Sequence, residues 1–178
     1  MRSSGRSWEL NSQAVRCLVL DSSTIIALAE IGMAGIMEAL GMDTIVPQAV
    51  YEEVVVKGHS RPGSGELEDL ARQGKVKVLA ARNRALVEAL HDPLGMGESE
   101  AIALAVEHGC PVILDDKIAR LKAKSMGLAV KGTIGLLRLA YDKGIIDKDK
   151  LIRALRELKE HGFRVSNSII NEILEKLK

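Results

Sequence analysis

Aromatic residues are scarce in this chain of 178 residues, which contains one Phe, one Trp and two Tyr, or 2% of the sequence. Proteins that read single-stranded nucleic acids stack the bases on aromatic side chains, so this scarcity argues against base recognition by stacking. Net charge is also close to zero, because 25 Lys and Arg face 24 Asp and Glu. Such a chain has no global attraction to a polyanion or a membrane, and a polyanionic ligand would need a local basic patch.

Cysteine and long apolar runs are equally scarce. Cys17 and Cys110 are the two cysteines, and no Cys-x-x-Cys pair or spaced Cys/His set could hold zinc. Each sits at or beside a predicted strand, so we expect two reduced thiols in the core. No apolar run approaches the roughly 18 residues of a membrane span, and residues 1–16 are too polar for a signal peptide. We therefore expect a cytoplasmic protein that does not contact membranes.

The hydrophobic content of 47% is sufficient for one core. Apolar runs of strand length alternate about five times with helical patterns, which is typical of a three-layer α/β/α sandwich with a mostly parallel sheet of four to five strands. The predicted strands cover residues 17–20, 44–46, 75–79, 111–114 and 128–130. We expect a flexible N-terminal segment (1–15), an α/β domain (16–145) and a pair of C-terminal helices packed on it (146–178).

Carboxylates directly follow two of these predicted strands. Asp21 closes the run Cys17-Leu18-Val19-Leu20, and Asp115 and Asp116 close the run Pro111-Val112-Ile113-Leu114. In a parallel sheet, ligands bind outside the carboxyl ends of the strands, so these acids should meet at one edge. Hard oxygen ligands suit Mg²⁺ and Mn²⁺, which makes a divalent metal site the first hypothesis.

Further acids fall near the same edge. Glu52 and Glu53 lie on a helix opened by Pro47, and Glu98 lies in the first turn of the helix that leads back into the 111–114 strand. Any one acid alone has a simpler explanation, because the helix dipole favours Asp and Glu in first turns. Helix capping, however, does not require the acids to meet in one place. Their combination therefore favours a shared site.

The order of four motifs resembles PIN domains. These motifs are Leu20-Asp21-Ser22-Ser23, Pro47-x-x-Val50-Tyr51-Glu52-Glu53-Val54, Gly97-Glu98-Ser99-Glu100-Ala101-Ile102 and Leu114-Asp115-Asp116-Lys117-x-Ala119-Arg120. The resemblance covers about residues 16–144 and is closest to a PIN-like branch of predicted nucleic acid-binding proteins related to VapC-type toxins. Two further segments are similar to that branch, namely Gly132-Thr133-x-Gly135-Leu136 and Gly162-Phe163-Arg164-Val165-Ser166.

The resemblance implies a Mg²⁺- or Mn²⁺-dependent ribonuclease that acts on RNA. It assigns the first to fourth catalytic acids to Asp21, Glu53, Glu98 and Asp116, and the metal ligands to Asp21, Glu98, Asp115 and Asp116. The neighbouring Glu52 and Asp115 leave the second and fourth positions open. Further candidates are Ser22, Glu52, Lys117 and Arg120. The resemblance also allows the role of a toxin with an antitoxin protein as its partner, and we expect a homodimer.

Two alternatives follow from departures in the sequence. Leu114 stands where the family usually has a hydroxyl residue, two positions before the fourth acid, which favours a PIN-like module that binds nucleic acid or serves as a scaffold without cleaving. A phosphatase of the haloacid dehalogenase type also places acids after apolar strands, but it needs a second Asp where this chain has Ser23.

Lys117 and Arg120 could contact phosphate, although Arg120 is better placed to pair with Asp116 four residues earlier.

Overall fold

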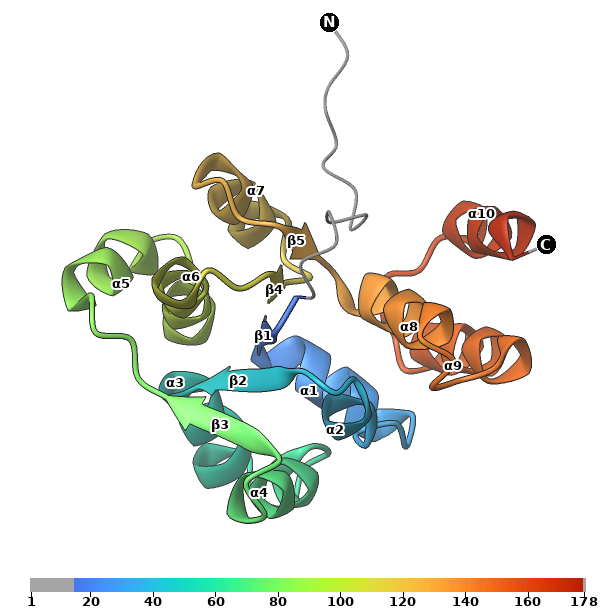
Figure 1. The fold of residues 1–178 in the computed structure, drawn as a ribbon, viewed down its shortest axis with the longest axis horizontal. Helices are drawn as coiled ribbons and strands as arrows, with labels where there is room; N and C mark the ends of the chain where they lie inside the picture. Colours follow the sequence, from blue (N-terminus) through green and yellow to red (C-terminus); the bar gives the residue numbers. More distant parts are fainter. Residues whose placement is uncertain (1–14, 178) are drawn as a thin grey trace, which may run out of the picture.

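Five parallel strands form one sheet in the order β3-β2-β1-β4-β5 (Figure 1). The computed structural model describes residues 15–177, so the predicted flexible segment lies almost entirely outside the described residues. The strands are β1 (Cys17–Leu20), β2 (Asp43–Pro47), β3 (Val76–Leu79), β4 (Val112–Ile113) and β5 (Val130–Lys131). The predicted sandwich with a parallel sheet is confirmed. The first strand in the chain occupies the centre of the sheet.

Ten α-helices and one π-helix connect and follow these strands within residues 15–177. Their bounds agree with most of the helical patterns in the sequence. The helices are α1 (Ser22–Glu30), α2 (Ile36–Ala39), α3 (Gln48–Tyr51), the π-helix η1 (Glu52–Lys57), α4 (Ser64–Arg72), α5 (Arg84–His91), α6 (Met96–His108), α7 (Lys117–Ser125), α8 (Thr133–Asp142), α9 (Lys148–Glu160) and α10 (Asn167–Lys176).

The two faces of the sheet are covered by different helices (Figure 1). Leu18 and Leu20 of β1 belong to a core shared with α1, α2, α4, α8 and α9, whereas Val19 belongs to a core shared with α5, α6 and α7. This alternation is the period of two expected for a strand that is buried on both faces. In the second core, the fully buried Ala101, Ala103 and Ala105 let α6 lie close against the sheet.

Cys17 and Cys110 form a disulfide, so the prediction of two reduced thiols is wrong. Their Cα atoms are 5.4 Å apart although 93 positions separate them in sequence. The sheet order explains this proximity, because β1 and β4 are neighbours paired through Val19 and Val112. The bridge lies at the amino ends of these strands, and the predicted acids lie at their carboxyl ends.

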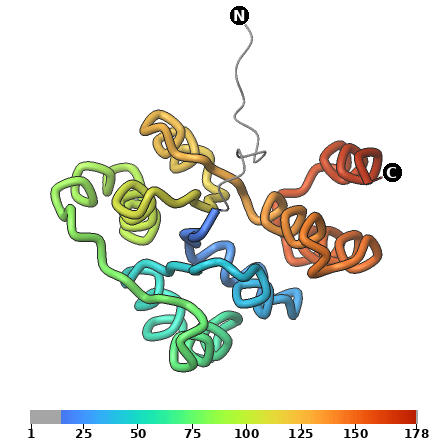
Figure 2. Tube along the Cα trace, viewed as in Figure 1, coloured from blue at the N-terminus to red at the C-terminus, as the bar shows by residue number. Residues whose placement is uncertain are grey.

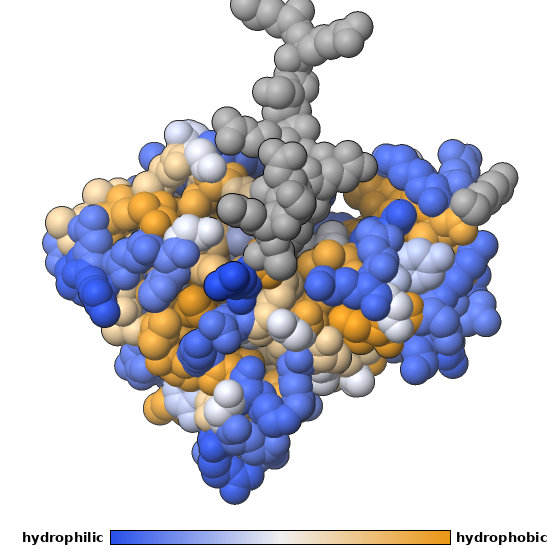
Figure 3. Space-filling model, viewed as in Figure 1, coloured by the Kyte–Doolittle hydropathy of each residue, from blue (hydrophilic) through white to orange (hydrophobic). Residues whose placement is uncertain are grey.

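The two C-terminal helices differ in how they pack. Helix α9 buries Leu151, Ala154, Leu155 and Leu158 in the same core as α1 and α8, whereas α10 has no buried residue. Figure 3 shows apolar surface beside α10, between hydrophilic side chains. In the part of the chain that the structure describes, no helix combines the length and the apolar character that a membrane span requires.

Candidate active site

A cavity of about 400 Å³ lies where β1 ends, between η1 and the start of α6. Three predicted acids from these three elements line it, namely Asp21, Glu53 and Glu98. Glu52 and Ser22, which the sequence analysis ranked below them, also line the cavity, and so does Lys57. The cavity therefore lies at the edge of the sheet where the sequence predicted the acids to meet.

Asp21 is the buried member of this set, with 2% of its surface exposed. Its backbone is still extended, and its Oδ1 atom caps α1 by accepting the N–H of Thr24 at 3.1 Å. Burial raises the pKa of Asp21 to about 7, and the negative charge of Asp115 adds to the increase. Hydrogen bonds from Thr24 and Ser23 oppose it. The charge of Asp21 is thus destabilised unless a proton or a cation accompanies it.

Asp115 lies beside Asp21 and shares a hydroxyl with it. The Oγ atom of Ser23 is 3.0 Å and 3.1 Å from the two carboxylate oxygens of Asp21, and 3.2 Å from Oδ2 of Asp115. A single hydroxyl proton cannot satisfy both carboxylates at once. Thr133 stabilises Asp115 further, because its N–H donates to Oδ1 at 2.8 Å and its hydroxyl to Oδ2 at 2.6 Å. Leu114 is fully buried and carries no hydroxyl, and the hydroxyls that contact these carboxylates come from Ser23, Thr24 and Thr133.

Glu98 also lines the cavity, from the first turn of α6. Its Oε2 atom accepts the N–H of Gly95 at 3.3 Å, which is the half of a capping box that a glycine N-cap can form. Burial raises the pKa of Glu98, and the charges of Asp116 and Glu53 contribute, whereas the hydrogen bond from Gly95 lowers it. Glu98 is therefore electrostatically coupled to two other predicted acids.

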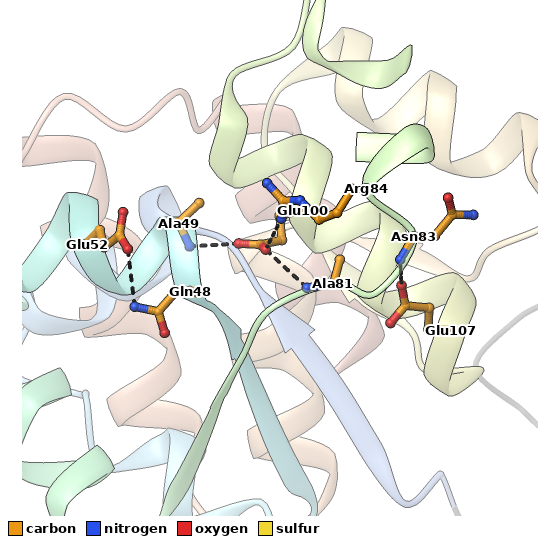
Figure 4. A network of polar contacts seen from close by, with 8 residues as sticks. All are labelled: Gln48, Ala49, Glu52, Ala81, Asn83, Arg84, Glu100 and Glu107. Atoms are coloured by element: carbon orange, nitrogen blue, oxygen red, sulfur yellow. Dashed lines mark hydrogen bonds and ion pairs between the residues drawn. The ribbon is translucent and has the colours of Figure 1, made fainter. Parts of the chain in front are cut away.

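The choice between Glu52 and Glu53 depends on η1. A π-helix closes its hydrogen bonds five residues apart rather than four, so α-helical phase does not predict where its side chains point. A Cβ atom on Gly97 would lie 3.4 Å from Oε2 of Glu53, so this carboxylate lies against α6. Glu52 instead accepts a hydrogen bond from Nε2 of Gln48 at 3.3 Å (Figure 4). The structure places Glu53 nearer to Glu98.

Asp116 is exposed and caps α7, where its Oδ1 atom accepts the N–H of Ala119 at 2.9 Å. The ion pair predicted between Asp116 and Arg120 is wrong, since no such pair forms between these two described residues; the capping bond occupies the carboxylate instead. Arg120 is half-buried and lies beside Gly132 and Asp115, and Lys117 is exposed at the start of α7. Neither Asp115 nor Asp116 lines the cavity.

The acids do not form a closed ligand set. Within residues 15–177, no three Asp, Glu, His or Cys side chains are grouped so that they could hold a metal ion. The donor chemistry nevertheless fits a hard divalent cation, because every candidate donor is a carboxylate oxygen and one of them is buried beside a second carboxylate. The structure brings Asp21, Glu53 and Glu98 to one cavity and places Asp115 next to Asp21.

Residues 17–178 match a family model described as a PIN domain. The chain belongs to the PIN domain family. The match continues through α9 and α10, beyond residues 16–144, which the main resemblance covered. PIN domains have a nuclease-type fold and generally use divalent metal ions. No curated protein matches this chain.

Sequence reasoning missed two polar groups of this PIN domain. Thr133 is fully buried and holds Asp115, and Glu100 is 2% exposed and joins three segments behind the cavity. A signal for Glu100 was present, because it is an acid within the apolar run of α6, where a charge is buried only when it has partners. Thr133 opens a helix directly after β5, a position that leads to the same edge of the sheet.

Proposed function

We propose that this PIN domain is a metal-dependent ribonuclease that hydrolyses phosphodiester bonds of RNA with Mg²⁺ or Mn²⁺. The observation that supports it is the convergence of three carboxylates from β1, η1 and α6 on one cavity, one of them buried. An enzyme that binds a divalent cation needs such carboxylates in their charged form. The raised pKa of Asp21 shows that this charge is poorly stabilised by the protein alone.

Asp21 and Glu98 would hold the ion, Asp115 or Asp116 would complete the ligand set, and Glu53 would contribute from beside Glu98 at the same cavity. When bound, the ion supplies Lewis-acid stabilisation of the negative charge that develops on the phosphate. The protein's own residues would prepare the site: Ser23 and Thr133 orient the carboxylates of Asp21 and Asp115 by donating hydrogen bonds to them.

The polyanionic backbone is the part of the substrate that this surface suits. Lys57 lines the cavity together with the acids, and Lys117 and Arg120 lie at the start of α7 on the side of Asp115 and Asp116. Cations in these positions would attract phosphate without reading sequence. The toxin role, the antitoxin partner, the homodimer and the cytoplasmic location stay predictions.

Cleavage of short RNAs in the presence of Mn²⁺ tests this proposal. We expect the wild-type protein to cleave and Asp21→Asn to lose activity by at least on the order of 100-fold, because a lost ligand costs more than a lost partner of a ligand. Asp149→Asn is the matched control, since Asp149 is an exposed acid in the first turn of α9 and should leave cleavage unchanged. Equal activity of the wild type and Asp21→Asn would refute the enzymatic role.

A non-catalytic RNA-binding module is the second candidate. It is favoured by the buried Leu114 and by the absence of a closed ligand set in residues 15–177. Such a module would bind RNA equally well in a chelator and in Mn²⁺, and it would not cleave in either. Measuring RNA affinity and cleavage in the same samples separates the two functions.

A further inference from the structure

Glu100 is a buried carboxylate whose two oxygens both accept hydrogen bonds (Figure 4). It does not line the cavity. Its Oε2 atom accepts the N–H of Ala49 at 2.7 Å. Its Oε1 atom accepts the N–H of Ala81 at 3.1 Å and pairs with Nη1 of Arg84 at 3.0 Å. One side chain of α6 thereby holds the start of α3, the loop after β3 and the start of α5.

Glu98 and Glu100 point to different sides of α6. Two residues correspond to about 200° of rotation around an α-helix. The Glu98 carboxylate therefore reaches the cavity, whereas the Glu100 carboxylate reaches Ala49, Ala81 and Arg84. Ala49 belongs to the cavity wall and precedes Glu53 by four residues on the continuous helical segment formed by α3 and η1. A displacement of α3 at Ala49 would therefore also displace Glu53.

The start of α3 has no side-chain cap of its own. Its N-cap residue is Pro47, whose side chain accepts no hydrogen bond. The first N–H groups of a helix need external acceptors, and a negative charge is favoured there. Glu100 provides both from a neighbouring helix.

Gly97 shows how closely the two segments approach. A Cβ atom at this position would lie 3.0 Å from Cγ2 of Val50 and 3.4 Å from Oε2 of Glu53. The first turn of α6 thus touches α3 and η1 directly, one residue before Glu98. Any widening of this contact would change the separation of Glu53 and Glu98.

We propose that Glu100 is the positioning residue of the site: by binding the Ala49 N–H it holds α3 against α6 and so sets the placement of Glu53 relative to Glu98. This role rests on the proposed function, because it matters for metal binding only if these two acids serve one site. Arg84 is not required for it. Its side chain is 55% exposed, and the start of α5 is also held by the N–H of Asn83, which donates to Oε1 of Glu107 at 2.7 Å.

Three variants separate positioning from general stability. Glu100→Gln keeps the volume of the side chain but turns one acceptor oxygen into an N–H₂ donor. The Gln side chain therefore cannot use two oxygens to accept the N–H groups of Ala49 and Ala81. Glu100→Asp keeps the charge and both oxygens on a shorter side chain, and it serves if the Gln variant does not fold. Arg84→Gln removes the ion pair and leaves the bonds to Ala49 and Ala81 intact.

The first measurement uses the metal-free protein and the nuclear Overhauser effect between Gly97 and the methyl groups of Val50. We expect this signal to weaken in Glu100→Gln, to recover in part in Glu100→Asp, and to match the wild type in Arg84→Gln. The second measurement is Mn²⁺ affinity by calorimetry. Glu100→Gln should bind on the order of 10-fold more weakly, and this loss should not add to that of Glu53→Gln, because Glu100 acts through Glu53.

An unchanged Gly97–Val50 signal in both Glu100 variants would overturn the positioning role, as would full additivity with Glu53→Gln. The same changes in Arg84→Gln would also overturn it, because they would indicate loosening of α5 rather than of α3. Failure of the wild type to bind Mn²⁺ would instead overturn the proposed function and the metal-site role given to Glu100, whatever the metal-free signal shows. The two failures are therefore distinguishable.

Discussion

Replacing Asp21 with Asn removes a buried ionisable group and keeps the helix cap. The Asn side chain retains an oxygen in the place of Oδ1, which accepts the N–H of Thr24, and Asn is as good an N-cap residue as Asp. What changes is the charge, in a position of 2% exposure next to Asp115. The substitution thus isolates the free-energy cost of ionising Asp21 inside the folded protein.

The sign and size of this cost follow from the pKa of Asp21, which rises from 3.8 to about 7 on folding. Between these values the folded state binds more protons than the unfolded state, so the free energy of unfolding falls as pH rises. At about 1.4 kcal/mol for each pH unit, the whole effect is about 4 kcal/mol. Most of it, about 3 kcal/mol, falls between pH 5 and pH 8. Relative to the wild type, Asp21→Asn should therefore gain about 3 kcal/mol over this range.

Urea unfolding followed by circular dichroism, at intervals from pH 5 to pH 8 and in a chelator, measures this gain. The control is Asp147→Asn, because Asp147 also caps a helix by accepting a backbone N–H but is exposed and does not line the cavity. This variant removes a capping charge away from the predicted acids and should not reproduce the gain of Asp21→Asn. A constant difference between Asp21→Asn and the wild type across the range would refute the assignment of a destabilising charge to Asp21.

Three other predictions test the fold. Replacing Cys17 and Cys110 with Ser removes a disulfide that closes a loop of 93 positions. This change should lower the free energy of unfolding by about 4–5 kcal/mol and should make the protein's stability independent of a reductant. A variant as stable as the oxidised protein would contradict this prediction. Gly97→Ala should destabilise the protein, because the added Cβ atom would meet α3. Gly65 is at the matching second position of α4 and has open space around it. Gly65→Ala should therefore be neutral or stabilise the protein by up to about 1 kcal/mol. Leu155→Ala should cost about 2–5 kcal/mol in urea unfolding, because Leu155 is fully buried; a smaller cost would indicate that α9 is not part of the main core.

The sequence predicted the sheet and the general position of the site because both depend on local patterns. Apolar runs such as residues 17–20 and 111–114 end in acids, and parallel strands bring their carboxyl ends to one edge. Asp21, Glu53 and Glu98 accordingly line one cavity. The helix opened by Pro47 was also located correctly, although its second half is the π-helix η1.

The details that the sequence did not predict depend on contacts between distant segments. The orientations of Glu52 and Glu53 depend on the π-helical turn. Asp115 lies next to Asp21 because Thr133 holds its carboxylate there with a hydrogen bond. The disulfide between Cys17 and Cys110 follows from the adjacency of β1 and β4. The spacing of the two cysteines in the sequence does not predict this adjacency. Local periodicity carries no information about such pairings.

The strand order has a consequence for how the protein is made. β1 is central, β2 and β3 extend the sheet to one side, and β4 and β5 extend it to the other, so the first and second halves of the chain lie on opposite sides of β1 (Figure 2). Asp21 and Glu53 come from the first half, whereas Glu98, Asp115 and Asp116 come from the second. Synthesis proceeds at about 5–20 residues per second, so a growing chain lacks a complete site for several seconds. Under the proposed activity, the nascent protein remains harmless to the ribosomal and messenger RNA around it until its second half has emerged and docked.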